Sequence, residues 1–479
     1  MSLSLRPAFF WAKRFNWVVF ALFFPLAAQL QAIPQLPTKN GATVVYTLKD
    51  CLELGLSRNT DILRAEQDIE RSQGLVITAK SLVYPKLTLN GRAEERNDDL
   101  FANGDSAERQ KFREYWTVSV MATQSLYSGG ANRQKIAISK LENAAALAQM
   151  RSVTNRVLRD IQHAVYEAVV QEALIEARKK TVALLADELQ RQKQYFDAGK
   201  TTRFNVLRTQ VSLSNQQVLL LEAQSELLSS RVRLSQLLQI EWPGDGASRP
   251  PFLLKEAMDC PQVTESEDQL VAMALSRRPE LEVLRHEIEK SQRQVKVEKA
   301  ANLPNIDAFA GYELRRDQNG SGLGDHVSAG AFGLLGTWNI FDGFSGKGKA
   351  ISAEAALQGR RVSLDKTTLQ VQSEVRDAYA RLRTAGESVV IQKGNILTAE
   401  ESVKLSRNSL DAGYATLLDV LQATLDLSTA RLESVRARQR YMNALSDLQY
   451  AVSLQFQDDP AARTPKSPAE DTPVPAPSP

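Results

Sequence analysis

Few residues in this sequence have the types and spacing that catalytic or metal chemistry requires. The three histidines, His163, His286 and His326, are scattered and do not stand at the spacing of a metal motif. The chain contains no HExxH zinc motif, no Gly-rich phosphate loop and no Gly-x-Ser-x-Gly nucleophile turn. We therefore expect no enzyme activity, no metal site and no cofactor.

The two cysteines, Cys51 and Cys260, are the other residues with chemical potential. Each stands near the start of one half of the chain, so the two could form a disulfide in an oxidising compartment. They could equally be two isolated, buried thiols, because sequence alone does not fix connectivity. Both interpretations stay open at this stage.

The elements that would position any site occur twice, because the chain carries an internal duplication. Matching segments recur in the same order at 56–62 and 275–281, 69–73 and 288–292, 127–129 and 341–343, and 197–199 and 411–413. The pattern indicates two copies of one large unit rather than a short solenoid repeat. We place the repeats at residues 33–240 and 264–457, joined by an irregular linker at 241–263.

Each repeat begins with a helix and a pair of strands. The helix is expected over about 48–82 or 268–302, and a proline, Pro85 or Pro304, ends it. Alternation of apolar and polar side chains then predicts strands. These strands are expected at about 86–95 and 115–126 in the first repeat and at about 305–315 and 327–341 in the second. The polar stretches between them, 96–111 and 317–325, are expected to be exposed loops.

Very long helices complete each repeat. Uninterrupted helix-forming sequence predicts them at 131–196 and 204–242, with counterparts at about 349–410 and 417–456. Each pair turns within 197–205 or 411–419. Gly199 and Gly413 fit the glycine that ends a helix, while Thr202 and Thr416 fit the N-cap of the next one.

The ends of the chain indicate export. Basic residues, an apolar run at 17–30 and small-residue cleavage after Ala32 predict a signal peptide over 1–32, with a membrane anchor as the alternative. No later run of about 20 apolar residues follows. Residues 458–479 have the composition of a disordered tail. A net charge of only +3 argues against a nucleic-acid partner.

This ordered set of features resembles the TolC-like outer membrane efflux protein family over about residues 46–457. The resemblance rests on the opening segment at 46–56, the prolines after the first helices, the turns at 127–130 and 341–344, and the paired Asp-Ala-Gly turns. It implies a mixed, mainly α fold and a homotrimer. Each chain would give four strands to a 12-stranded outer-membrane β-barrel in contact with lipid, and its helices to a long periplasmic coiled-coil tunnel.

The resemblance also implies a passive export duct for small molecules or proteins. The partners would be a periplasmic adaptor (membrane fusion) protein and an inner-membrane efflux pump or ABC exporter. The adaptor would meet the hairpin tips, at Gly199, Lys200, Thr202, Gly413, Tyr414 and Thr416. A structural periplasmic coiled-coil or adaptor protein is the alternative, but an adaptor would lack the strand pairs and would carry one hairpin.

A channel constriction is the remaining site that the resemblance implies. Asp419 falls on one position of the family's aspartate constriction, whereas Gln422 falls on the second and Asn205 on a gate aspartate position. Ala415 stands where the family carries a basic gate residue. Three Asp419 carboxylates around an axis would favour cations. Alternatively, Asp419 is a solvated residue in the first turn of a helix, where a carboxylate is favourable.

Overall fold

The computed structural model describes residues 44–95, 114–242, 252–255, 259–316 and 326–454, all within one compact unit. The expected signal peptide, the two expected loops at 96–111 and 317–325, and the expected tail at 458–479 lie outside these residues.

Both repeats contain the same order of elements: a short strand, two helices, two strands and two long helices. The first repeat consists of β1 (Val44–Tyr46), α1 (Leu48–Arg58), α2 (Thr60–Lys80) with a 3₁₀ turn η1 (Ser81–Val83), β2 (Lys86–Glu95), β3 (Glu114–Ser128), α4 (Ala131–Asp197) and α5 (Arg203–Leu237). The second consists of β4 (Phe252–Leu254), α6 (Glu267–Arg277), α7 (Pro279–Ala300), β5 (Asn305–Arg316), β6 (His326–Thr337), α8 (Ser345–Asp411) and α9 (Leu417–Val452).

The first helix of each repeat is broken, so the expectation of one unbroken helix is wrong in both. Asn59 ends α1 and caps α2: its Oδ1 accepts the Asp61 N–H at 2.9 Å, and its Nδ2 donates to the Leu237 carbonyl at 3.1 Å. In the second repeat Arg278 stands at the break, because Pro279 disfavours helical backbone at the residue before it.

The sequence predicted an irregular segment between the repeats, but part of this segment forms a strand. Its strand β4 pairs in parallel with β1, in the register Val44 to Phe252 and Tyr46 to Leu254. The Lys255 N–H donates to the Tyr46 carbonyl at 3.0 Å. Strands of three residues are too short to show a period of two, so the sequence pattern could not reveal them.

The four longer strands form one antiparallel sheet in the order β2-β3-β5-β6. In this register, Leu89 lies opposite Val120, Val120 opposite Tyr312, and Ala310 opposite Phe332. Since side chains alternate between faces, this register brings apolar residues from all four strands to one face. On the opposite face β2, β3 and β5 place polar residues such as Asn90, Ser119 and Glu313, whereas β6 contributes mainly apolar residues and glycine there.

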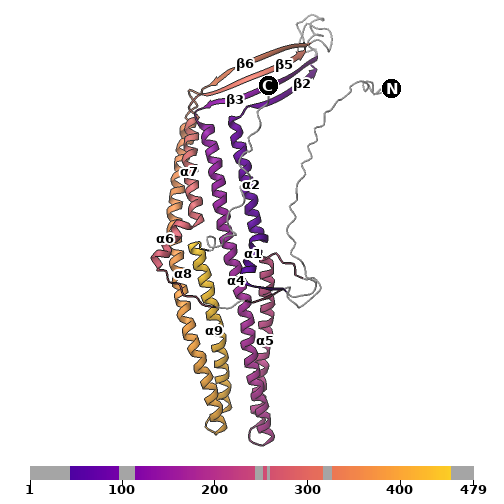
Figure 1. Ribbon diagram of the computed structural model, residues 1–479, viewed down its shortest axis with the longest axis vertical. Helices are drawn as coiled ribbons and strands as arrows, with labels where there is room; N and C mark the ends of the chain where they lie inside the picture. The colour runs from indigo at the N-terminus through magenta and orange to yellow at the C-terminus, as the bar shows by residue number, and fades with distance from the viewer. Residues whose placement is uncertain (1–43, 96–113, 243–251, 256–258, 317–325, 455–479) are drawn as a thin grey trace, which may run out of the picture. The chain divides into compact units, whose positions relative to one another are not determined.

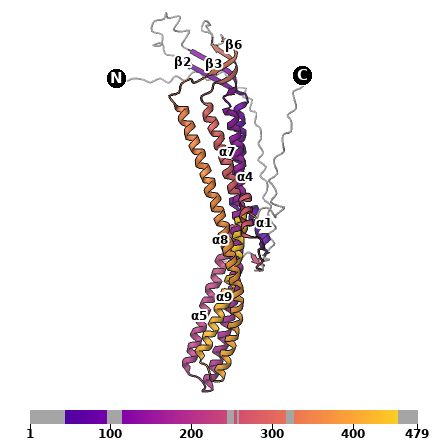
Figure 2. The same cartoon turned by 90° about the vertical axis from the view of Figure 1, so that its left-hand side faces the viewer.

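The long helix α4 contacts different helices in its two halves. Near the sheet, α4 lies between α2 and α7, and α7 packs on α8. Further along, α4 packs on α5 and α9, and α9 packs on α8. Both long hairpins end at the same end of the unit, opposite the four-stranded sheet (Figures 1 and 2).

Two hydrophobic clusters fill the middle of the unit, one for each repeat. Cys51 is buried in the cluster formed by α1, α4, the end of α5 and β4. Cys260 is half-buried against the cluster formed by α6, α8 and α9. Both described cysteines are thiols and are not joined by a disulfide. Their positions in separate clusters explain why the possible pairing does not occur.

Candidate channel site at the hairpin tips and the sheet

The two tips have the same backbone geometry. Gly199 and Gly413 have φ values of +69° and +81°, which favour glycine. The Lys200 N–H donates to the Tyr195 carbonyl at 2.7 Å, and the Tyr414 N–H donates to the Ser409 carbonyl at 2.8 Å. These are the six-residue hydrogen bonds of the Schellman motif. Both turns therefore present the same shape, and they differ only in their side chains.

The next helices begin differently at the two tips. Thr416 and Asp419 form a reciprocal capping box, in which the Thr416 N–H and hydroxyl donate to Asp419 Oδ2 at 2.8 and 2.7 Å. At the other tip Thr202 makes no side-chain capping bond. Instead, Asn205 Nδ2 donates to the Thr201 hydroxyl at 2.9 Å. Only the second tip thus has a fully capped helix start.

The capping bonds keep a negative charge at the second tip. Hydrogen bonds from the hydroxyl and backbone of Thr416 lower the pKa of Asp419 below its ordinary value. Asp419 is exposed, so its carboxylate is available to solvent while it caps α9. Gln422 is also exposed, and its amide donates to Asp426 Oδ1 at 2.9 Å. Two of the three residues expected at a constriction, Asp419 and Gln422, therefore lie one turn apart on α9, and the third, Asn205, lies on α5.

A link between the two tips was not anticipated from the sequence. The Tyr195 hydroxyl, near the end of α4, donates to Asp411 Oδ1, at the end of α8, at 3.1 Å. This bond to Asp411 raises the pKa of Tyr195. The residues are more than 200 positions apart, and no local pattern could have shown that the ends of α4 and α8 meet.

The sheet exposes a continuous apolar face. Leu87, Leu89, Phe332 and Leu334 are 75, 70, 88 and 68% exposed, although they belong to paired strands. Contiguous exposed apolar surface of this kind indicates contact with a membrane or a partner. The strands are 10 to 15 residues long, and about 9 to 11 residues suffice to cross a bilayer.

The helices and histidines give no competing chemistry in the part of the chain that the structure describes. None of the described helices is both long and apolar enough to span a membrane. No group of three or more His, Cys, Asp or Glu side chains among the described residues could hold a metal ion. His163 Nε2 lies 3.2 Å from Asp447 Oδ1, and His286 Nε2 lies 3.7 Å from Glu282 Oε1. Each of these two histidines therefore stands beside one carboxylate.

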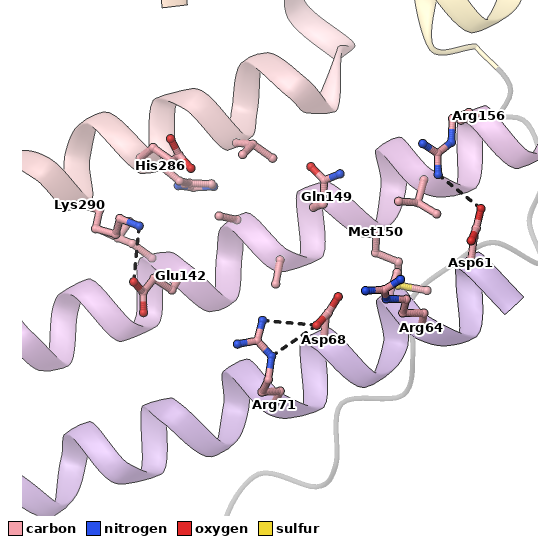
Figure 3. Close-up of a pocket in the computed structure, with 17 residues that line it drawn as sticks. Asp61, Arg64, Asp68, Arg71, Glu142, Gln149, Met150, Arg156, His286 and Lys290 are labelled. Atoms are coloured by element: carbon pink, nitrogen blue, oxygen red, sulfur yellow. Dashed lines mark hydrogen bonds and ion pairs between the residues drawn. The ribbon is translucent and has the colours of Figure 1, made fainter. Parts of the chain in front are cut away.

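A groove lies between α2, α4 and α7 (Figure 3). Its volume is about 520 Å³, and Ala145 and Ala146 are among the residues that line it. Its rim charges are largely paired with one another, as Arg71 with Asp68, Arg156 with Asp61, and Lys290 with Glu142. We read it as a solvated groove between helices.

An exposed four-stranded sheet with one apolar face is carried on long paired helices. The chain belongs to the outer membrane efflux protein family, whose sequence model matches residues 52–238 and 270–453. These two matches lie in the two repeats. The protein is accordingly an export channel located in the cell outer membrane, and an envelope spacer or adaptor is excluded as its class.

Known relatives are distant but cover most of the chain. Nodulation protein T of Rhizobium leguminosarum bv. trifolii is 20% identical over 85% of this chain and 85% of its own length. The alkaline protease secretion protein AprF of Pseudomonas aeruginosa is 22% identical over 84% of this chain and 83% of its own. The outer membrane efflux protein BepC of Brucella suis is 22% identical over 68 and 69%.

Solved structures share the fold at similarly low identity. The outer membrane protein VceC of Vibrio cholerae superposes with a TM-score of 0.70 at 19% identity, over 85% of this chain and 95% of its own. The open state of the MtrE outer membrane channel of Neisseria gonorrhoeae gives a TM-score of 0.67 at 16% identity, over 85 and 88%.

Proposed function

We propose that three copies of this chain close their sheets into one outer-membrane barrel and form a passive export duct. The observation that carries the proposal is the apolar face of a sheet whose outer strands, β2 and β6, each have one described neighbour. An open strand edge in lipid leaves backbone groups unpaired at a cost of several kcal/mol each, so the sheet must close. Three sheets of four strands supply twelve, more than the roughly eight that a barrel needs.

The outer surface of α5 supports the trimer. It carries seven apolar side chains that are 42 to 66% exposed and follow a heptad repeat. We call these residues the α5 stripe: Phe204, Leu207, Val211, Val218, Leu221, Leu228 and Val232. The stripe faces away from α4, the long helix on which α5 packs. A heptad seam of this type is completed by a helix from another chain.

The far edge of the helical layer offers the complementary surface. There α8 exposes Val390 and Leu397, which lie one heptad apart at the level of α5. Since the order in the lower half is α5-α4-α9-α8, the α5 stripe and this α8 edge lie on opposite sides of one chain. Head-to-tail contact of the two edges generates a closed ring, and a ring of three matches the proposed barrel.

In this assembly the face of the sheet that carries Asn90, Ser119 and Glu313 lines the duct, and the helices form its periplasmic tunnel. Transport through it requires no chemistry, so an inner-membrane efflux pump or ABC exporter supplies the energy through a periplasmic adaptor. The adaptor contacts the tips at Gly199, Lys200, Thr202, Gly413, Tyr414 and Thr416. Relatives named for efflux and for protease secretion make both small molecules and proteins reasonable cargo.

Asp419 forms a ring of three carboxylates at the narrow end of the tunnel in this proposal. Its exposure and its lowered pKa support this role, since the group stays ionised in the periplasm. Gln422 and Asn205 line the same region without charge. A single anionic ring favours cations over anions at the constriction.

Purification and electrical recording test the proposed duct. The protein, extracted from outer membranes in mild detergent, is expected to migrate as a trimer when unheated and as a monomer after boiling. The trimer is expected to conduct ions across a planar bilayer. Recovery as a soluble periplasmic monomer without conductance would contradict the proposal.

A further inference from the structure

The two tips differ sharply in charge although their backbones match. Residues 193–208 contain four cations and one anion: Lys193, Lys200, Arg203, Arg208 and Asp197. Their net charge is therefore +3. The equivalent residues 407–422 contain one cation and two anions, Arg407, Asp411 and Asp419, and their net charge is −1. The difference is four charges between two turns of the same backbone geometry.

The positive charge of the first tip is not neutralised within the described part of the chain. Lys193, Lys200, Arg203 and Arg208 are all exposed, and none takes part in an ion pair between described residues. The nearby anions of the second tip are engaged elsewhere, Asp411 by Tyr195 and Asp419 by Thr416. Four cations are thus left to solvent or to a partner.

Apolar side chains accompany these cations. Phe196, on α4 and outside the α5 stripe, is 44% exposed, and Phe204, where the stripe ends at the tip, is the stripe residue nearest to these cations. Large aromatic groups ringed by charge are typical of protein interfaces, in which aromatic anchors bury area and rim charges steer the partner. This combination indicates a protein surface at the first tip.

We propose that the first tip, residues 193–208, selects a periplasmic partner whose helical hairpin carries acidic side chains beside an apolar residue. The inference rests on the proposed function, because it specifies the chemistry of the adaptor that the tips meet. The second tip, with its exposed Tyr414 and its two carboxylates, does not attract such a hairpin. In a trimer the two kinds of tip alternate, so the acidic hairpin binds three of the six.

Synthetic helical hairpins closed by a disulfide provide the probe. One carries glutamates beside a leucine at its turn, and matched versions carry glutamine or lysine at the same positions. Fluorescence anisotropy measures their binding to the detergent-solubilised trimer. We expect the glutamate hairpin to bind at least tenfold more tightly than the glutamine hairpin at low salt, with the advantage shrinking as salt is raised.

A charge-reversed tip makes the test specific. Lys200→Glu with Arg203→Glu is expected to weaken the glutamate hairpin about tenfold and to strengthen the lysine hairpin. The matched control, Arg133→Glu with Lys135→Glu, changes two exposed cations near the sheet end of α4 and is expected to leave binding unchanged.

The outcomes separate the two proposals. Equal binding of glutamate and glutamine hairpins, absence of binding, or binding unaffected by the tip variant would overturn the acidic-partner inference. Each of these results, seen in a trimer that still conducts, would leave the export duct standing. A protein that neither forms a trimer nor conducts would overturn the duct itself.

Discussion

At the scale of single residues, the two tips differ at the third position of the helix that leaves each turn. Asp419 closes a capping box with Thr416, whereas the Asn205 amide donates a hydrogen bond to the Thr201 hydroxyl. The sequence indicated the turns correctly, since glycine and threonine have clear roles there. The Thr-x-x-Asp spacing of Thr416 and Asp419 is itself the signature of a capping box, whereas Thr202 and Asn205 at the matching positions form none.

Replacing Thr416 with alanine tests the cap. Thr416→Ala is expected to destabilise the start of α9 by about 1 kcal/mol at pH 7, whereas Thr416→Ser should stay near wild type. Folding lowers the pKa of Asp419. The stability that its carboxylate gives the folded protein is therefore present above about pH 4, near the pKa of an unfolded Asp, and it is lost as the pH falls through the lowered pKa. Thermal unfolding of trimers at several pH values measures both effects. A wild-type advantage that does not shrink in acid would contradict this reading.

At the scale of elements, the long helices were predictable and the breaks were not. The absence of Pro and Gly marked α4 and α5 clearly, although α5 ends at Leu237 rather than near Trp242. The breaks at Asn59 and Arg278 depend on distant partners. Asn59 bonds to the end of α5, and Arg278 Nε donates to the Ala451 carbonyl at the end of α9 at 2.7 Å. Contacts of this range leave no local signal.

Arg278 holds three elements together at its break. Its side chain is only 4% exposed, pairs with Glu374 of α8 at 2.5 Å, and lies 5.0 Å from the centre of the Tyr450 ring. Removing it leaves the Ala451 carbonyl without its partner, whereas Glu374, which is 40% exposed, keeps the hydrogen bond from Gln370. Arg278→Ala is therefore expected to destabilise the protein by about 1–3 kcal/mol.

The control for Arg278 is an exposed pair. Arg381 and Asp377 form an i,i+4 bridge in which both side chains are more than half exposed, so Arg381→Ala should cost about 0.5 kcal/mol or less. Denaturation of both variants at matched protein concentration gives the comparison. Equal losses would show that Arg278 is not a structural tie between α7, α8 and α9.

At the scale of the whole molecule, the uncovered α5 stripe makes assembly testable. Val218→Lys with Leu221→Lys places two charges in the seam and removes apolar burial worth about 1.5–3 kcal/mol per side chain. We expect the unheated trimer band to disappear and light scattering to report a monomer. Glu226→Lys, an exposed site off the stripe on the same helix, should preserve the trimer. A stable trimer in the double variant would place the subunit interface elsewhere.

The constriction belongs to the whole molecule as well, since one carboxylate becomes a ring only by assembly. Asp419→Asn removes three charges from the trimer while the amide oxygen can still accept from Thr416, so the cap is retained. We expect cation selectivity to fall, seen as a shift of the reversal potential toward zero in a salt gradient. Asp426→Asn, two turns further along α9, removes the same charge away from the tip and should shift it little. An unchanged reversal potential for Asp419→Asn would leave Asp419 with capping alone, and its difference from Asn205 would then concern the stability of α9 rather than conduction.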